Sequence, residues 1–213
     1  MVLITGASGG LGTVVARAFL EAGATVAAVS RSGSDISADL TRPDEAARAA
    51  ETVRAQFGRL DVLLHLAGGF EGGTPVAQTP DGVWSRMFDL NVHSAFYIAR
   101  AVLPAMLEAG YGRIVAIGSK TAVEPVATLA AYGASKAALV ALVRTIALEV
   151  KLTGVTANVV LPSVIDTPAN RAADPNAGFS RWVKPESIAR LLLWLASEAA
   201  ADINGAVVPI YGP

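Results

Sequence analysis

The sequence predicts an α/β fold, a single domain with a doubly wound parallel sheet and helices on both faces. Three observations predict it. Short apolar runs alternate along the chain with longer amphipathic stretches, as strands and helices do in parallel sheets. The first apolar run leads directly into a glycine-rich turn. The chain has 213 residues, 53% of them hydrophobic, which is enough for one sheet buried on both faces but not for a second domain of ordinary size.

The N-terminal residues predict a β-α-β unit that binds a nucleotide. Strands at Val2–Ile4 and Thr25–Val29 flank an amphipathic helix at Leu11–Ala22. The turn before the helix is Thr5-Gly6-Ala7-Ser8-Gly9-Gly10-Leu11-Gly12. Because glycine tolerates positive φ and has no Cβ, this turn can bring backbone N–H groups against a pyrophosphate at the helix N-terminus. We therefore expect a nucleotide site here.

The segment after the second strand is unusually short. Five residues separate Ser30 from the candidate third strand, Ile36–Ala38, whereas a parallel crossover normally takes about a dozen or more. We therefore expect no helix between Arg31 and Asp39. We also expect a very short or irregular third strand and an adenine side of the nucleotide site that is more open than usual.

The remaining elements continue the alternation of strands and helices. Further strands are expected at Val62–Leu66, Ile114–Ile117, Thr156–Leu161 and Ala206–Ile210. Further helices are expected at Pro43–Phe57, Asp81–Glu108, Leu129–Leu152 and Pro185–Ser197. The last of these helices begins with proline, which is tolerated in a first turn.

Side chains with acid–base chemistry follow the strand at Ile114–Ile117. Ser119 comes just after that strand, and Tyr132 and Lys136 lie in the first turns of the next helix. Positions i and i+4 share a helix face, so the Lys136 ammonium would lie beside the phenol of Tyr132 and lower its pKa from about 10. Such a phenol exchanges protons near neutral pH. Because ligands bind at the carboxyl ends of parallel strands, these residues and Gly68 can face one crevice.

Together these motifs resemble the short-chain dehydrogenases/reductases, whose signature is Thr-Gly-x-x-x-Gly-x-Gly with a Ser and Tyr-x-x-x-Lys site. The resemblance spans essentially the whole chain. It implies hydride transfer between a nicotinamide and a carbonyl or alcohol carbon of a small molecule. In that reaction Tyr132 would give and take the proton, Lys136 would also hold the cofactor ribose, and Ser119 would donate a hydrogen bond to the substrate oxygen. Asn91 would position a water and Lys136.

The same resemblance implies further site residues. Asp39 would contact the adenine, and Thr167 would either contact the nicotinamide carboxamide or simply cap a helix. A small substrate lid is expected at about residues 168–184 of the single domain, 1–213. The residues expected to bind the cofactor are Thr5, Gly6, Ser8, Gly10, Leu11, Gly12, Ser30, Arg31, Asp39, Leu40, Ala67, Gly68, Tyr132, Lys136, Pro162, Val164, Ile165 and Thr167.

The chain departs from the family pattern at two places. It has His65-Leu66-Ala67-Gly68 where Asn-Asn-Ala-Gly is common, and Pro162-Ser163 where Pro-Gly is usual. Neither departure removes a catalytic group, and we expect His65 to be a hydrogen-bonded core residue. A narrower resemblance, to the dihydropteridine reductase branch, lies in residues 67–73 and 161–171, although that branch generally lacks the serine found at 119.

The residues that end the second strand bear on the choice of cofactor. An acidic residue there would bind the ribose hydroxyls of NAD, whereas an arginine accepts the 2′-phosphate of NADP. Ser30 and Arg31 therefore favour NADP, with NAD as the alternative. The leading hypothesis is an NADP-preferring carbonyl reductase or alcohol dehydrogenase. Two alternatives to this function stay open. The substrate could be a planar heterocycle such as a pterin, or the protein could be a nucleotide-sensing module without catalysis.

Three further loop residues have two interpretations each. Glu71 and Glu124 follow strands at the catalytic edge, where each could touch substrate or be an ordinary solvated carboxylate. Trp182 could stack on a planar substrate or pin the lid to the body.

Composition argues against several other classes of protein. A net charge of −1 and a pI near 6.1 give no basic field for nucleic acid. The absence of cysteine excludes disulfides and thiol catalysis, and no residues show the spacing of a metal site. The chain shows no leader and no long uncharged apolar stretch, so we expect a cytoplasmic protein without a membrane span. The mean hydropathy of +0.47 and the resemblance indicate a homodimer or homotetramer formed through the two long helices.

Overall fold

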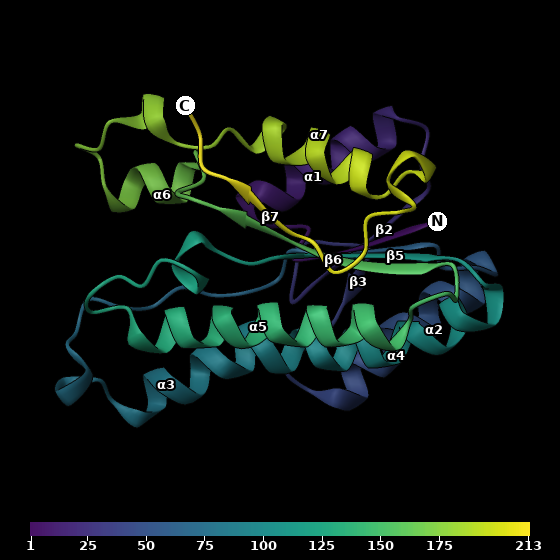
Figure 1. The fold of residues 1–213 in the computed structure, drawn as a ribbon, viewed down its shortest axis with the longest axis horizontal. Helices are drawn as coiled ribbons and strands as arrows, with labels where there is room; N and C mark the ends of the chain where they lie inside the picture. The colour runs from purple at the N-terminus through teal and green to yellow at the C-terminus, as the bar shows by residue number, and fades with distance from the viewer.

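The computed structural model describes residues 1–213 and is organised around a seven-stranded sheet with the order β3-β2-β1-β4-β5-β6-β7 (Figure 1). All neighbouring strands are parallel. The strands are β1 (Val2–Thr5), β2 (Val26–Ser30), β3 (Ile36–Ser37), β4 (Val62–His65), β5 (Gly112–Ile117), β6 (Val155–Pro162) and β7 (Val207–Ile210). The predicted doubly wound parallel fold is confirmed.

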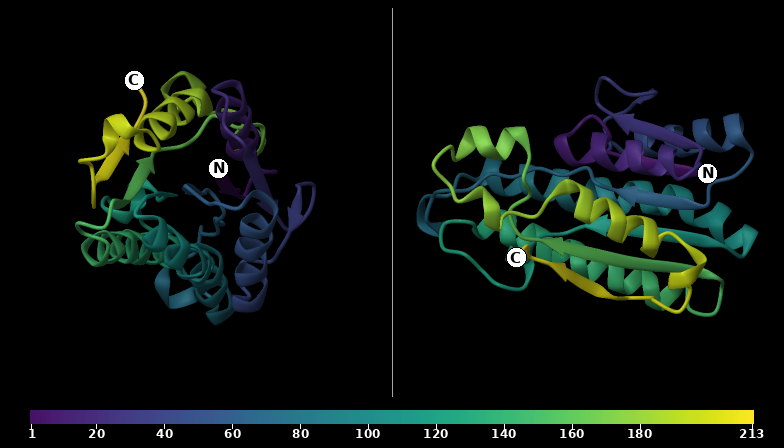
Figure 2. Two further views of the ribbon diagram at one scale, coloured as in Figure 1. Left: turned by 90° about the vertical axis from the view of Figure 1, so that its right-hand side faces the viewer. Right: turned by 90° about the horizontal axis from the view of Figure 1, so that it is seen from above.

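Helices cover both faces of the sheet (Figure 1). They are α1 (Gly10–Glu21), α2 (Pro43–Phe57), α3 (Asp81–Phe88), α4 (Ser94–Ala109), α5 (Ala130–Glu149), α6 (Pro168–Ala173) and α7 (Pro185–Leu195). Helices α1 and α7 pack side by side on one face, and α2, α4 and α5 cover the other (Figure 2). Successive strand residues point to opposite faces, so Leu3 joins the core under α4 and α5 while Ile4 joins the core under α1 and α7.

The position of β1 fixes where a ligand can bind. It pairs with β2 on one side and with β4 on the other, so the strand order reverses at this point. In open parallel sheets, ligands bind beyond the carboxyl ends of the strands at such a reversal. The loops after β1, β4, β5 and β6 therefore form the expected site.

The short connection after β2 is as predicted. There is no helix between Arg31 and Asp39, and β3 has only two residues. The loop is held by its own side chains: the Ser30 hydroxyl donates to the carbonyl of Ser32 at 2.6 Å. The Asp35 carboxylate accepts a hydrogen bond from the backbone N–H of Ala28 at 3.0 Å.

The chain is helical throughout the predicted stretch Asp81–Glu108, but the helix is not a uniform α-helix. Helix α3 ends at Phe88, α4 begins at Ser94, and Asp89–His93 form a π-helical turn between them. A π turn carries one residue more than an α turn, and such turns occur often at functional sites. Apolar periodicity does not reveal it because the helical pattern continues on both sides.

Helix α5 ends at Glu149, before the predicted Leu152. Leu152 itself has a φ of +67°, which a continuing helix cannot accommodate. By length and composition alone α5 could cross a membrane, with a mean hydropathy of 1.3 over 18 residues. Its buried face contributes Leu139, Val143 and Ile146 to the core, which accounts for that hydropathy.

Candidate active site

The glycine turn after β1 has the geometry of an anion-binding turn. Gly6 has a φ of +69°, and a Cβ there would lie 2.7 Å from the backbone N of Ala67. A Cβ on Gly12 would collide with the carbonyl oxygen of Gly6. Gly9 is the N-cap of α1 and provides no side chain to accept the first-turn N–H groups. These groups are available to an anion, so the turn fits the pyrophosphate of a dinucleotide.

Thr167 lies against this turn. A Cβ on Gly10 would be 3.0 Å from the Cβ of Thr167, which is buried. The Thr167 hydroxyl accepts a hydrogen bond from the N–H of Asn170 at 3.3 Å and so caps α6. The capping role is confirmed, and the same residue stands where it can also contact a bound dinucleotide.

The loop after β6 completes this side of the site. Pro162 ends the strand, and Val164 is 48% exposed and lines the cavity described below. Ile165 forms an isolated parallel bridge with Val183, and its carbonyl accepts a hydrogen bond from the Asn170 side chain at 2.7 Å. These contacts tie the beginning and the end of the expected lid together.

The ends of β2 and β3 form the side of the site where the sequence analysis expects the adenine. Arg31 is exposed, and its guanidinium makes no ion pair. A Cβ added to Gly33 would lie 4.0 Å from the Cβ of Ser8, so the short loop lies over the glycine turn. The Asp39 carboxylate accepts hydrogen bonds from the N–H and hydroxyl of Thr41 at 3.0 and 2.8 Å. Leu40 is buried in the core.

Ser119, Tyr132 and Lys136 line one cavity of about 820 Å³ at the carboxyl ends of the strands, together with Gly68 and Pro162. The loop after β5 carries Ser119, and the first turns of α5 carry the other two. The Lys136 ammonium donates to the carbonyl of Ile117 at 2.9 Å. The structure therefore brings the three predicted residues together.

The predicted lowering of the Tyr132 pKa by Lys136 is wrong. Burial raises the pKa of Tyr132, and a hydrogen bond with Ser119 only partly offsets this. The Lys136 Nζ lies 6.0 Å from the centre of the Tyr132 ring, and burial lowers the Lys136 pKa to about 8. Desolvation disfavours the charged form of both groups, and at this separation it outweighs their attraction.

Asn91 clamps a loop in this structure. Its side-chain oxygen accepts the N–H of Gly69 at 2.9 Å, and its side-chain nitrogen donates to the Gly69 carbonyl at 3.0 Å and to the Ser135 hydroxyl at 3.1 Å. No direct hydrogen bond joins Asn91 to Lys136. Both residues instead flank Gly68, where a Cβ would lie 2.7 Å from Asn91 Oδ1 and 3.3 Å from Lys136 Nζ.

Three residues of the site escaped the sequence analysis. The Thr121 hydroxyl lies 2.8 Å from that of Ser119. Ser135 links Asn91 to the carbonyl of Tyr132, to which it donates at 2.8 Å. Phe70 packs its ring against Tyr132, with 4.9 Å between the ring centres. Ser135 directly precedes Lys136, but nothing in the sequence marks it as buried.

Comparison with known proteins agrees with this geometry. Residues 1–178 match the short chain dehydrogenase family. The chain belongs to this family. The uncharacterized oxidoreductase YvrD of Bacillus subtilis is 33% identical over 251 residues, which cover 100% of this chain and 95% of YvrD. The 3-oxoacyl-(acyl-carrier-protein) reductase FabG of Escherichia coli is 32% identical over 232 residues, covering 99% of this chain and 95% of FabG.

A solved structure of a short-chain type dehydrogenase/reductase from Mycobacterium ulcerans has the same fold. It is 30% identical and superposes with a TM-score of 0.92, over 98% of this chain and 87% of that one. This short-chain dehydrogenase is therefore an NAD(P)-dependent oxidoreductase that transfers hydride between nicotinamide and a carbonyl or alcohol carbon. The names of these relatives do not favour pterin reduction or a non-catalytic sensing role.

The two loop carboxylates at the catalytic edge are paired in this dehydrogenase. The Arg86 guanidinium donates to Glu71 at 2.8 Å. Lys120 and Glu124 form an ion pair at 3.0 Å, and both line the cavity. No group of three or more His, Cys, Asp and Glu side chains is placed to hold a metal ion.

His65 occupies the position where many short-chain dehydrogenases have asparagine, and it is a hydrogen-bonded core residue as predicted. Its Nδ1 lies 3.0 Å from the hydroxyl of Thr5, and its Nε2 lies 3.3 Å from that of Ser94. Burial, together with the nearby charge of Lys136, lowers the pKa of His65 to about 3.

This buried histidine makes stability depend on pH. In the unfolded chain His65 takes up a proton below its ordinary pKa of about 6.5, whereas in the folded protein it stays neutral. The stability it contributes is therefore complete above pH 6.5 and is lost as the pH falls toward 3. Between pH 7 and pH 5, the free energy of unfolding should fall by about 2 kcal/mol more in the wild type than in His65→Asn. Urea unfolding at the two pH values measures this difference. An unchanged pH dependence in the variant would contradict the buried neutral histidine.

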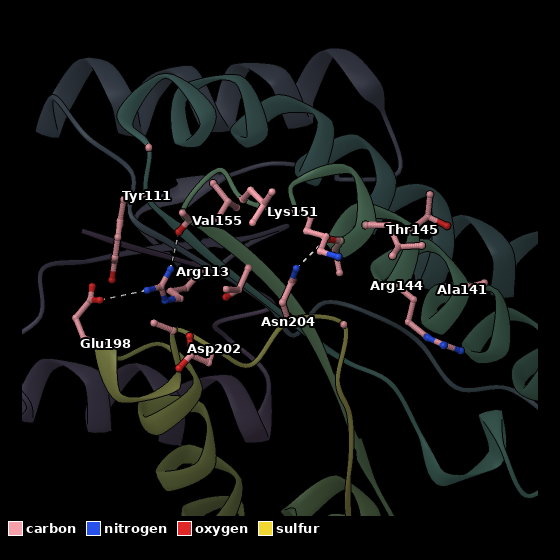
Figure 3. Close-up of a pocket in the computed structure, with 18 residues that line it drawn as sticks. Tyr111, Arg113, Ala141, Arg144, Thr145, Lys151, Val155, Glu198, Asp202 and Asn204 are labelled. Atoms are coloured by element: carbon pink, nitrogen blue, oxygen red, sulfur yellow. Dashed lines mark hydrogen bonds and ion pairs between the residues drawn. The ribbon is translucent and has the colours of Figure 1, made fainter.

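A second cavity, of about 980 Å³, lies at the opposite end of the strands of this dehydrogenase (Figure 3). At its centre the buried Arg113 donates to the carbonyls of Gly112 and Gly154 at 2.9 Å each, and it faces Glu198 at 3.4 Å. The Arg113 guanidinium also stacks on the ring of Tyr111, 4.4 Å from its centre. Ser119, Tyr132 and Lys136 line the other cavity and not this one.

Proposed function

We propose that Tyr132, Ser119 and Lys136 carry the proton chemistry of this dehydrogenase. The observation that supports this is their meeting in one cavity, whose lining residue Gly68 directly follows the Ala67 that packs against the glycine turn. The bound nicotinamide supplies or accepts the hydride. Ser119 donates a hydrogen bond to the substrate oxygen, where negative charge develops during reduction. Tyr132 gives that oxygen its proton and takes it back in the reverse direction.

Lys136 and Asn91 have supporting roles in this proposal. The buried Lys136 ammonium, anchored on the carbonyl of Ile117, holds the cofactor ribose and resupplies the proton of Tyr132. Asn91 keeps the loop at Gly69 in place through its two hydrogen bonds. The glycine turn, the Ser30–Leu40 segment, Ala67, Gly68 and residues 162–167 would hold the cofactor. Residues 168–184 act as the substrate lid, since Asn170 and Trp182 line the cavity.

The experiment that tests this function is oxidation of NADPH or NADH with a panel of aldehydes and ketones, followed by nucleotide absorbance. We expect turnover that saturates with the carbonyl substrate. Binding of both nucleotides without turnover of any carbonyl would contradict the proposal. Quinonoid dihydropterin belongs in the same panel, because it tests the proposed likeness to the dihydropteridine reductase branch.

We further propose that NADP is the preferred cofactor. The support is Arg31, which is exposed, makes no ion pair and directly follows β2. The strand itself ends in Ser30, so no carboxylate stands at this position. We expect Arg31→Gln to weaken NADPH binding about tenfold, since a charged hydrogen bond to phosphate is lost. NADH binding should change less than about twofold. Equal losses for the two nucleotides in a fluorescence titration would contradict the assignment, and Arg190→Gln, at an exposed arginine on α7, is the control.

We also propose a cytoplasmic homodimer or homotetramer. Its support is the exposed apolar surface of α4 and α5, where Phe96 is 40%, Leu107 43% and Leu148 75% exposed. Covering these side chains in an interface would remove apolar area from water. Sedimentation equilibrium of the purified protein measures the number of chains.

A further inference from the structure

The side chain of Phe70 is a solvent-exposed apolar ring beside Tyr132, the proposed proton donor. It is 67% exposed and belongs to the loop after β4. Its ring meets that of Tyr132 at 76°, with 4.9 Å between the centres, which is an edge-to-face arrangement. The Phe70 ring therefore packs against Tyr132 and also lines the cavity.

The loop that carries Phe70 is fixed on both sides of it. Gly69 is hydrogen-bonded twice to the Asn91 side chain, and Glu71 is paired with Arg86. Further along, the N–H of Gly73 donates to the carbonyl of Thr128 at 2.9 Å. Thr128 has a φ of +67°, a strained conformation for a threonine. The fold thus orders a loop and still leaves its large apolar ring in solvent, an arrangement that burial within the chain does not account for.

Other apolar side chains also line the cavity. Trp182 lines it and is supported by Phe179, whose ring centre is 4.9 Å away. Val126 and Val164, which line the same cavity, are 53% and 48% exposed. Ser119 and Tyr132 line the same cavity, as do the paired Lys120 and Glu124. Such a site can orient a ligand by its polar groups and bind the rest of it by apolar contact.

We propose that Phe70 is a specificity-determining residue and that the substrate is an aldehyde or ketone whose carbonyl is attached to an aromatic or similarly flat unsaturated ring. The carbonyl oxygen sits at Ser119 and Tyr132, the ring packs on Phe70, and Trp182 is a second aromatic side chain in the cavity lining. This assignment rests on the proposed carbonyl chemistry. An aromatic pair is stabilised beyond the area it buries by an amount that corresponds to about two- to tenfold in kcat/KM.

The test compares benzaldehyde with cyclohexanecarbaldehyde, which match in size but differ in ring flatness and aromaticity. The measured quantity is the ratio of their kcat/KM values in the full-length enzyme. Phe70→Leu keeps an apolar side chain and removes the ring, so we expect this ratio to fall about fivefold. Phe70→Tyr keeps the ring and should preserve the ratio. Phe96→Leu, at an exposed phenylalanine outside the cavity, is the matched control and should also preserve it.

The outcomes separate this inference from the function on which it rests. If the wild type reduces carbonyls but Phe70→Leu leaves the ratio unchanged, Phe70 does not contact the substrate ring and the inference is overturned. A wild type that prefers the saturated aldehyde also overturns it. If neither aldehyde nor any other carbonyl is turned over despite nucleotide binding, the proposed function itself fails, and the inference fails with it.

Discussion

Replacing Tyr132 by phenylalanine is expected to lower kcat/KM for carbonyl reduction about a thousandfold. The substitution removes one hydroxyl and keeps the ring that packs on Phe70. Because burial raises the pKa of Tyr132, the phenol is protonated at neutral pH and ready to give a proton to the substrate oxygen. Phenylalanine has no proton to give, so the loss should appear mainly in kcat. Steady-state kinetics with a saturating nucleotide measure it.

Two controls distinguish a lost proton donor from a damaged fold. NADPH binding to Tyr132→Phe should stay within about threefold of the wild type, since only one hydroxyl is removed. Tyr97→Phe, on α4 and outside the cavity, removes the same group and should leave kcat/KM unchanged. A Tyr132→Phe enzyme that retains more than about a tenth of the activity would remove Tyr132 from its assigned role.

Replacing Gly6 by alanine is expected to destabilise the protein by about 3 kcal/mol or more and to abolish nucleotide binding. Two costs add at this position. Alanine is strained at a φ of +69°, and its Cβ would lie 2.7 Å from the backbone N of Ala67. Gly6 and Ala67 follow the paired strands β1 and β4, so the two backbones cannot separate without disturbing the sheet, and the glycine turn must distort. Urea unfolding and a nucleotide titration measure the two effects.

Gly23 is the matched control for this prediction. It also has a positive φ, +82°, but no atom lies within 4 Å of the position its Cβ would take. Gly23→Ala therefore carries only the conformational cost, about 1 kcal/mol, and should bind nucleotide normally. If the two variants are equally stable, close packing of the turn against Ala67 is not what requires glycine at position 6.

Local patterns predicted those parts of the protein that depend on neighbouring residues in the sequence. The strands and most helices follow from apolar periodicity, and the five residues after Ser30 left no room for a helix. The π turn inside the predicted Asp81–Glu108 helix was not visible, because such a turn adds one residue without changing composition. The pKa of Tyr132 was also wrongly predicted, because spacing on a helix says that two groups are neighbours but not how deeply they are buried.

By itself, the sequence determined the α/β class, the glycine turn, the position of Ser119 after a strand and that of Tyr132 and Lys136 one turn apart on the next helix. These follow from steric rules for glycine and from side-chain periodicity, which act over a few residues. Only the tertiary structure decided that Asn91 clamps Gly69, that Phe70 packs on Tyr132, and that Lys136 is buried against Ile117. Such contacts join residues far apart in the chain, and desolvation and hydrogen bonding there depend on what the whole fold places around each group.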